Sequence, residues 1–297
     1  MLKGLAITPP VIGRISIGRV VERNGKRLPE KDDQFTLTSQ IQNRDGWVLH
    51  PLDESLRKAT GGKLRSIPVR MMFNDPTLNL RADYSLFDRT TGRPVCVGNG
   101  ETCRRSSAEG IAALPCPSPD GCAFANGDCK AYARLNVVIG EDDALGSFVL
   151  RTTSYNTIRT LAARLQYFQA VSGGLLACMP LELKLRGKST TMSFRTAIFY
   201  VDLVVRSGMT VEEAIVEARR LDESRRASGF EQDTLDEAAR KGFANGAFED
   251  LAEDVPAVVE EFHPAPGHIE AGAGAVGQPP ASLRGKLEEK VTRLGNG

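Results

Sequence analysis

Five of the six cysteines lie close together in a polar part of the chain. They are Cys96, Cys103, Cys116, Cys122 and Cys129, separated by Gly, Pro, Asn, Asp and Ser residues that favour tight turns. The stretch has few large apolar side chains, so packing alone would not hold such loops in place. Thiolates are the ligands that zinc prefers in structural sites, and zinc binding releases free energy that can order a segment without its own core. The sequence therefore predicts a structural zinc site in residues 96–129.

The residues alone leave open which of the five thiols is not a ligand, because a tetrahedral site takes four. Metal identity rests on ligand softness, so iron or an iron–sulfur cluster is the alternative to zinc. Cys103 stands before Arg104 and Arg105 and is either an alternate ligand or a redox-sensitive thiol. Cys178, in the apolar sequence GLLACMPL, is expected in the core.

The remaining reactive residue types argue against an enzyme. Four thiolates leave no open coordination position for a water, whereas a hydrolytic zinc keeps one. His263 and His268 lie in a Pro- and Gly-rich stretch, and His50 ends a strand-like segment before Pro51. The segment RGKSTT lacks the upstream glycine of a phosphate-binding loop. We therefore expect no catalytic residues and no small-molecule substrate.

Charge is unevenly distributed along the 297 residues, although the net charge is only +1. The balance of Lys and Arg over Asp and Glu is +6 in residues 1–70, −3 in 71–150, +6 in 151–210 and −8 in 211–297. A basic body with an acidic C-terminal arm suits nucleic acid or an acidic protein as partner, with the arm competing for the same surface. Solvated faces without such a role are the alternative.

Nothing in the sequence indicates a leader or a membrane span. The opening MLKGLAITPPVIGRISIGRV has no signal-peptide apolar core, and no later run approaches the roughly 20 apolar residues of a membrane helix. We therefore expect a cytoplasmic protein, in which thiols stay reduced and favour metal binding over disulfides.

Periodicity predicts an α+β protein with a β-rich first part. Asn24-Gly25 is a hairpin signal. The expected strands are Val11 to Val21, Phe35 to Ser39, Trp47 to His50, Ser66 to Phe73, Leu80 to Phe87, Ala131 to Ile139, Gly146 to Thr152, Cys178 to Leu185 and Thr196 to Val205. The expected helices are residues 155–172 after an N-cap at Ser154, residues 211–226 after a capping box of Thr210 and Glu213, and a weaker helix over 232–244.

The expected helices and strands divide the chain into three segments. Residues 1–205 form a β-rich domain that carries the zinc loop at 96–129, and residues 206–253 form a helical arm. Residues 254–297, rich in Pro, Gly and Ala, are expected to be a disordered acidic linker ending in a short amphipathic helix, SLRGKLEEKVTRL. Its apolar stripe could dock on a partner; the stripe consists of Leu283, Leu287, Val291 and Leu294.

Several segments together resemble a known phage family. They are GRISIGRV, DQFTLTS, PVCVGNGETCRR, PCPSPDGC with the later CK pair, and AYARLNVVI. This combination resembles the recombination directionality factors of serine integrases, whose relatives are often labelled "hydrolase or metal-binding protein". The resemblance covers roughly residues 1 to 205.

The resemblance implies a non-enzymatic accessory protein of site-specific DNA recombination. Such a factor binds a serine integrase on its DNA and favours excision over integration. It also implies Cys96, Cys116, Cys122 and Cys129 as the metal ligands, with Cys103 as the alternate. The integrase or another recombination protein is the expected partner.

A basic segment could also contact DNA directly. Cations bind phosphate and aromatic rings stack on bases, so the two together are typical of a nucleic-acid groove. The candidate residues are Arg159, Arg164, Lys184, Arg186, Lys188 and Arg195, with Tyr155, Tyr167 and Phe194 interleaved. The alternative functions are therefore a zinc-stabilised single-stranded-DNA-binding protein of a recombination or repair system, and a metal-dependent hydrolase.

Overall fold

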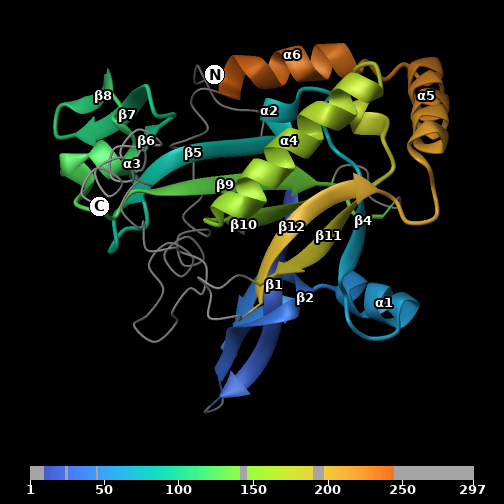
Figure 1. The fold of residues 1–297 in the computed structure, drawn as a ribbon, viewed down its shortest axis with the longest axis horizontal. Helices are drawn as coiled ribbons and strands as arrows, with labels where there is room; N and C mark the ends of the chain where they lie inside the picture. Colours follow the sequence, from blue (N-terminus) through green and yellow to red (C-terminus); the bar gives the residue numbers. More distant parts are fainter. Residues whose placement is uncertain (1–9, 24–25, 45, 141–145, 190–196, 244–297) are drawn as a thin grey trace, which may run out of the picture. The chain divides into compact units, whose positions relative to one another are not determined.

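The computed structural model describes residues 10–23, 26–44, 46–140, 146–189 and 197–243 (Figure 1). The chain divides into two compact units. One consists of Met1–Gly187 and Phe199–Ala265, and the other of Lys188–Ile198 and Pro266–Gly297. Nearly all described residues belong to the first unit, which contains the elements discussed below.

Nine strands form one large mixed sheet. Within this sheet β1 and β10 pair in parallel, and the other pairings are antiparallel. In spatial order the strands are β3 (Gly46–Leu49), β2 (Lys26–Asn43), β1 (Val11–Arg23), β10 (Ser147–Thr152), β9 (Lys130–Val137), β5 (Leu80–Phe87), β6 (Pro94–Gly98), β7 (Thr102–Ser107) and β8 (Gly110–Pro115).

A second sheet has three strands. Its order is β12 (Ile198–Val205), β11 (Leu181–Lys188) and β4 (Ser66–Val69). Most expected strands are present within a few residues of their predicted bounds. Arg23 pairs with Lys26, as the hairpin signal at Asn24-Gly25 predicts.

The main hydrophobic core lies between one face of the large sheet, the small sheet and helix α4 (Tyr155–Val171). Strand side chains alternate between faces, so Leu135 of β9 and Leu150 of β10, which pair directly, point to the same side. Both are buried in a cluster with Leu161 and Leu165 of α4. Figure 1 shows α4 lying across β9 and β10. Helical spacing of its apolar residues produces this packing, as predicted.

Two helices begin at the capping residues that the sequence predicted. Ser154 caps α4 by accepting the backbone N–H of Thr157 at 3.5 Å. Thr210 and Glu213 form the predicted capping box at the start of α5 (Val211–Ala227). The last described helix is α6 (Gln232–Phe243), close to the expected 232–244.

Helix α1 (Pro51–Thr60) was not predicted, although its capping residue was singled out. His50 follows β3 and caps α1, since its Nδ1 accepts the backbone N–H of Leu52 at 3.2 Å. Its ring also packs edge-on against Phe148 with centroids 4.9 Å apart. Burial lowers the pKa of His50, so it is a neutral packing and capping residue.

Helices α5 and α6 both contact the core region. Ala214 and Ala218 of α5 are fully buried in the main cluster. Asp236 of α6 accepts the backbone N–H groups of Asn74 and Asp75 at 3.0 and 3.1 Å, just before the short helix α2 (Pro76–Asn79). These bonds fasten α6 to the turn that precedes β5.

The described residues thus form an α+β fold with a dominant β-sheet, as expected. None of the described helices is both long and apolar enough to span a membrane.

Candidate metal centre

The sheet end formed by β6, β7 and β8 carries the first two cysteines on one face. Cys96 pairs with Arg105, and Gly98 pairs with Cys103. Directly paired residues point to the same side of a sheet, and so do residues two apart on one strand. Cys96, Cys103 and Arg105 therefore share a face.

The loop from Cys116 to Cys129 returns over this face. It contains the single-turn helix α3 (Ser118–Gly121) and the 3-10 turn η1 (Ala123–Ala125). The backbone N–H of Cys116 donates to the carbonyl of Glu101 at 2.8 Å, which fixes the start of the loop beside the β6–β7 turn. Ser118 and Asn126 adopt positive φ angles of 65° and 47°, which tighten the turns at its two ends.

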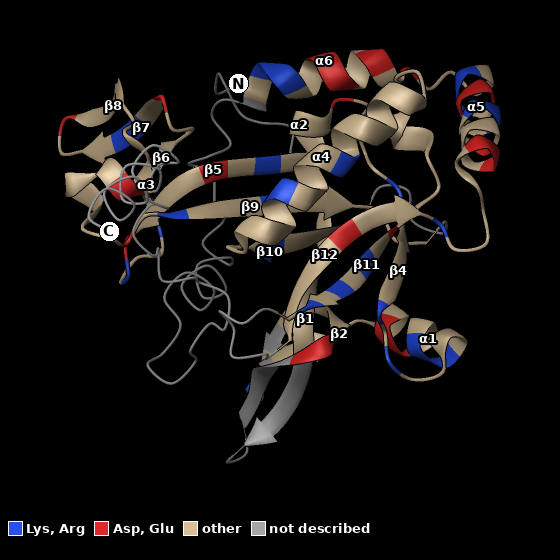
Figure 2. Ribbon diagram, viewed as in Figure 1, with Lys and Arg blue, Asp and Glu red and all other residues tan. Residues whose placement is uncertain are grey.

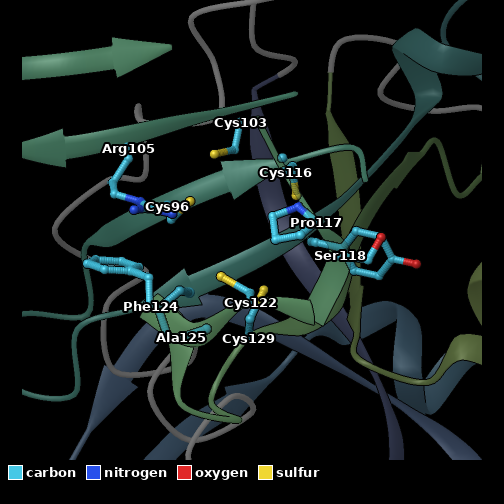
Figure 3. Close-up of a pocket in the computed structure, with 13 residues that line it drawn as sticks. Cys96, Cys103, Arg105, Cys116, Pro117, Ser118, Cys122, Phe124, Ala125 and Cys129 are labelled. Carbon is cyan, nitrogen blue, oxygen red and sulfur yellow. The ribbon is translucent and has the colours of Figure 1, made fainter. Parts of the chain in front are cut away.

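All five clustered cysteines line one pocket (Figure 3). Cys103 is buried, and the other four are half-buried. In Figure 3 their side chains surround a common space, with Arg105 and Phe124 at one side. Every described cysteine is free, so no disulfide holds the loop. The sequence cluster is therefore also a spatial cluster.

Gly98 provides the floor of this pocket. A Cβ atom at this position would lie 2.6 Å from Cβ of Cys103, 2.8 Å from the carbonyl oxygen of Thr102 and 2.9 Å from Sγ of Cys116. Real Cβ atoms essentially never approach other atoms so closely. Only glycine lets these two cysteines meet over β6 without displacing backbone.

The thiols differ in their surroundings. Burial, together with the neighbouring cysteines, raises the pKa of Cys129 to about 12. Burial likewise raises the pKa of Cys103 to about 11. The thiol of Cys103 donates to the carbonyl oxygen of Pro115 at 3.7 Å, so this sulfur already has a partner on β8. With pKa values this high, both thiols are protonated at neutral pH when no metal ion is bound.

Arg105 supplies the nearest positive charge. Its guanidinium carbon lies 3.8 Å above the centre of the Phe124 ring, a cation–π contact. Burial acts to lower the pKa of Arg105, but the hydrogen bond to Cys96 and the other nearby thiols outweigh it and raise the pKa. Its Nε atom is buried and has no hydrogen-bond partner in the described structure. From the sequence, Arg105 was noted only as a neighbour of Cys103; the two-residue spacing along a strand is the signal that places both on one face.

Within the described ranges, no group of three or more His, Cys, Asp and Glu side chains is arranged so that it could hold a metal ion as it stands. Cys178 lies outside the pocket and is buried in the core, as predicted, with its sulfur 3.6 Å from Nη1 of Arg225.

The predicted DNA-contacting residues do not form one set of unpaired cations. Arg164 of α4 and Arg186 of β11 both pair with the buried Asp202, at 3.0 and 3.4 Å. Lys184 pairs with Glu182 at 3.4 Å. Arg159 on α4 and Lys188 at the end of β11 are exposed, whereas Arg195 lies outside the described residues.

The aromatic residues of this segment also differ in placement. Tyr155 and Tyr167 of α4 are 61 % and 48 % exposed, so neither is a core residue. Phe194 lies outside the described residues. The same is true of the partner-docking candidates Leu283, Leu287, Val291 and Leu294 and of His263 and His268.

Comparison with known proteins identifies a family for this chain. No curated protein and no solved structure shows significant similarity to the chain. A family model described as Gp3-like, recombination directionality factor-like, matches residues 12–206. The matched region begins in β1, contains the five-cysteine pocket and ends just after β12. It spans well over half of the 297 residues, and its description indicates an accessory role in recombination. The chain therefore belongs to the Gp3-like family of recombination directionality factor-like proteins.

Proposed function

We propose that this protein is a non-enzymatic accessory factor that binds a serine integrase and favours excision over integration. The observation that carries the proposal is the family match over residues 12–206. That range includes most of both sheets and the whole cysteine pocket, and only helices α5 and α6 among the described helices lie outside it. A cytoplasmic location suits this role.

We propose further that the pocket binds a structural zinc ion through Cys96, Cys116, Cys122 and Cys129. The donor set fits the ion, because four thiolates complete a tetrahedral zinc site. Gly98 leaves room for Cys103 and Cys116 side by side, and Arg105 offsets part of the negative charge of the thiolates. Binding requires the four sulfur atoms to draw closer together than they lie now.

Cys103 is the thiol we leave out of the ligand set. It is the most buried of the five, and its hydrogen bond to Pro115 already satisfies it. Its position between Gly98 and Leu114 in the sheet makes it a packing residue of the β6–β8 meander.

The zinc ion would order the loop over the sheet and supply no chemistry to a substrate. Helix α3 and the turn η1 are each a single short turn, and only Ala125 is buried among their residues. So little burial cannot hold the loop, since an average buried methylene stabilises by only about 0.8 kcal/mol. Cross-linking the loop to β6 and to the start of β9 would provide the missing stability.

Direct DNA contact is a subordinate proposal. Arg159 and Lys188 are exposed cations, and Tyr155 offers an exposed ring one helical turn before Arg159. If they contact phosphate, affinity for DNA should fall steeply between low and high salt. Equal retention on DNA at both ionic strengths would refute this contact.

The decisive experiment is an in vitro recombination assay with a purified candidate serine integrase. The full chain should shift the products from integration to excision and should co-purify with the integrase. Cys129→Ser should lose both zinc and this effect, while the control Cys103→Ser should keep both. An integrase whose product ratio does not respond to the native chain would contradict the proposed function.

A further inference from the structure

Strand β8 is the last of the described strands at one end of the large sheet, beyond β7 (Figure 1). All six of its residues are exposed, including Ile111 at 48 % and Leu114 at 37 %. An edge strand presents backbone N–H and C=O groups on which another strand can add. Because every residue of β8 is exposed, this edge is accessible to a partner strand.

The features that usually protect an edge strand are missing from β8. Edge strands are commonly guarded by charged side chains, interior prolines, bulges or short length. The sequence of β8, GIAALP, contains no charged residue, and its one proline is the last residue; in Figure 2 the strand is drawn in tan. Its register with β7 is regular from Ser107 and Gly110 to Thr102 and Pro115. The strand is therefore suited to pairing.

Strand β3, at the other end of the described sheet, differs in these respects. It is only four residues long, and its register with β2 shifts between Thr38 and Gln42. The guanidinium carbon of Arg14 lies 3.7 Å from the centre of the Trp47 ring, so this side chain of β3 already has a cationic neighbour. Of these two edges, β8 is the better template for a further strand.

The direction of the backbone groups on β8 follows from its pairing with β7. The N–H of Cys116 donates to the carbonyl of Glu101 at 2.8 Å, in continuation of the β7–β8 register. Hydrogen-bonded and non-hydrogen-bonded pairs alternate along an antiparallel ladder. Gly110, Ala112 and Leu114 therefore bond toward β7. The residues between them, Ile111 and Ala113, direct their N–H and C=O groups toward the outer edge.

We propose that β8 pairs antiparallel with β8 of a second copy of this chain, about a two-fold axis at Ala112. In this register Ile111 of each copy lies opposite Ala113 of the other, and both residues offer outward backbone groups. The two symmetric pairs would therefore form four backbone hydrogen bonds. A two-fold axis at Ala113 would instead place Ile111 opposite Pro115, which has no N–H to donate.

The side chains of β8 are complementary to themselves in this register. Ile111 meets Ala113, Leu114 meets Gly110, and Ala112 meets its own copy, so each large residue faces a small one. No like charges are brought into direct opposition, because the strand carries none. Arg105, which pairs with Ala112, would lie three strand spacings from its copy, roughly 14 Å, which exceeds the Debye length of about 8 Å at physiological salt.

The interface would be small, since stable protein–protein interfaces use about 20–30 residues on each side. We therefore expect a weak dimer, with a dissociation constant in the micromolar range or above. Analytical ultracentrifugation of the full chain should show a monomer near 1 µM and a growing dimer fraction toward about 200 µM.

Ile111→Lys places a charge at the edge and should raise the dissociation constant at least about tenfold. Ala113→Pro removes an outward N–H but no bond to β7, and it should have the same effect. The matched control is Leu49→Lys on β3, since Leu49 is also 48 % exposed on an outer strand; this variant should dimerise as the native chain does.

Hydrogen exchange resolved by residue tests the register. The amides of Ile111 and Ala113 should exchange fast in the monomer and at least about fivefold more slowly at high protein concentration, because only the dimer bonds them. Those of Ala112 and Leu114, which bond β7, should change much less.

Three results would overturn the proposal. They are a monomer at every concentration, a dimer that Ile111→Lys and Leu49→Lys weaken equally, and slow exchange of Ile111 and Ala113 that does not depend on concentration, which would mean that another part of the same chain occupies the edge. The measurements need neither integrase nor DNA, so their outcome is separate from that of the proposed function.

Discussion

Gly98→Ala is the substitution that tests the pocket geometry most directly. The new Cβ would lie 2.6 Å from Cβ of Cys103, 2.8 Å from the backbone oxygen of Thr102 and 2.9 Å from Sγ of Cys116. Two of these neighbours belong to β7, which is held to β6 by strand pairing, so the clash cannot be relieved by rotating a flexible side chain. Either the strands separate or the cysteine side chains move apart.

The expected cost follows from overpacking. Forcing a methyl group into a filled site destabilises a protein by about 1–3 kcal/mol. In a chain of this size, 1 kcal/mol corresponds to a Tm change of roughly 2–4 °C, so a cost near 2 kcal/mol lowers Tm by about 4–8 °C. Because the displaced atoms include the sulfur of Cys116, the occupancy of the proposed zinc site should fall well below one ion per chain.

The matched control is Gly121→Ala in α3, on the same loop. Its Cβ would meet only Cβ of Pro117, at 3.3 Å, and no positive φ is required there. Zinc content by elemental analysis and thermal unfolding should be measured for the native chain and both variants. The reasoning fails if Gly98→Ala keeps the Tm and zinc content of the native chain, or if both variants lose them equally.

Three further results are expected. Cys129→Ser should release zinc to a chelator at least tenfold faster than the native chain, whereas Cys103→Ser should match the native rate; the reverse order would exclude the proposed ligand set. Asp236→Ala leaves two backbone N–H groups without their acceptor, so we expect a loss of about 2–4 kcal/mol in the free energy of unfolding by denaturant. Exposed Glu237→Gln, one residue on, should leave that free energy unchanged, and equal effects of the two changes would contradict this account. Burial acts to raise the pKa of Glu182, but hydrogen bonds from Ser207 and other groups outweigh it and hold the pKa below its ordinary 4.5. The stability that ionised Glu182 contributes is therefore fully present above the pKa of the unfolded state. It is lost as pH falls through the lower pKa of the folded state. Glu182→Gln should flatten the decline in stability below about pH 4.5, and an unchanged decline would refute the assignment.

Local sequence patterns predicted most of the helices and strands well, but they did not predict which strands pair with each other. Strand β5 has its predicted bounds, and α4 and α5 begin after their predicted caps, because alternation and capping are properties of neighbouring residues. The parallel contact of β1 with β10 has no local signal, since residues over a hundred positions apart form it. Strands β6 to β8 were missed because each is short and the Gly, Pro, Asn and Ser residues in and between them are typical of loops, although β6 and β8 carry apolar residues such as Val97 and Ile111.

The candidate sites likewise combine features that local sequence patterns predicted with features that depend on the tertiary structure. Cysteine spacing predicted that the five thiols would gather, and they line one pocket. The row of Arg81, Arg134 and Arg151 on three adjacent strands could not be predicted, because these residues become neighbours only through the register of the sheet. Conversely, Arg164 and Arg186 looked available in the sequence, but Asp202 from a later strand pairs with both.

The interior position of β1 in the large sheet, between β2 and β10, has a consequence for synthesis of the chain. Val11 pairs with Ser147, so the first strand cannot complete its hydrogen bonds until β10 has been made. At about 5–20 residues per second, the wait is on the order of ten seconds. During that time the β1–β2 hairpin presents an open edge on which a neighbouring nascent chain could add a strand. Expression at low temperature or with a holdase chaperone should therefore raise the soluble yield, and premature termination before residue 147 should give a product prone to aggregation.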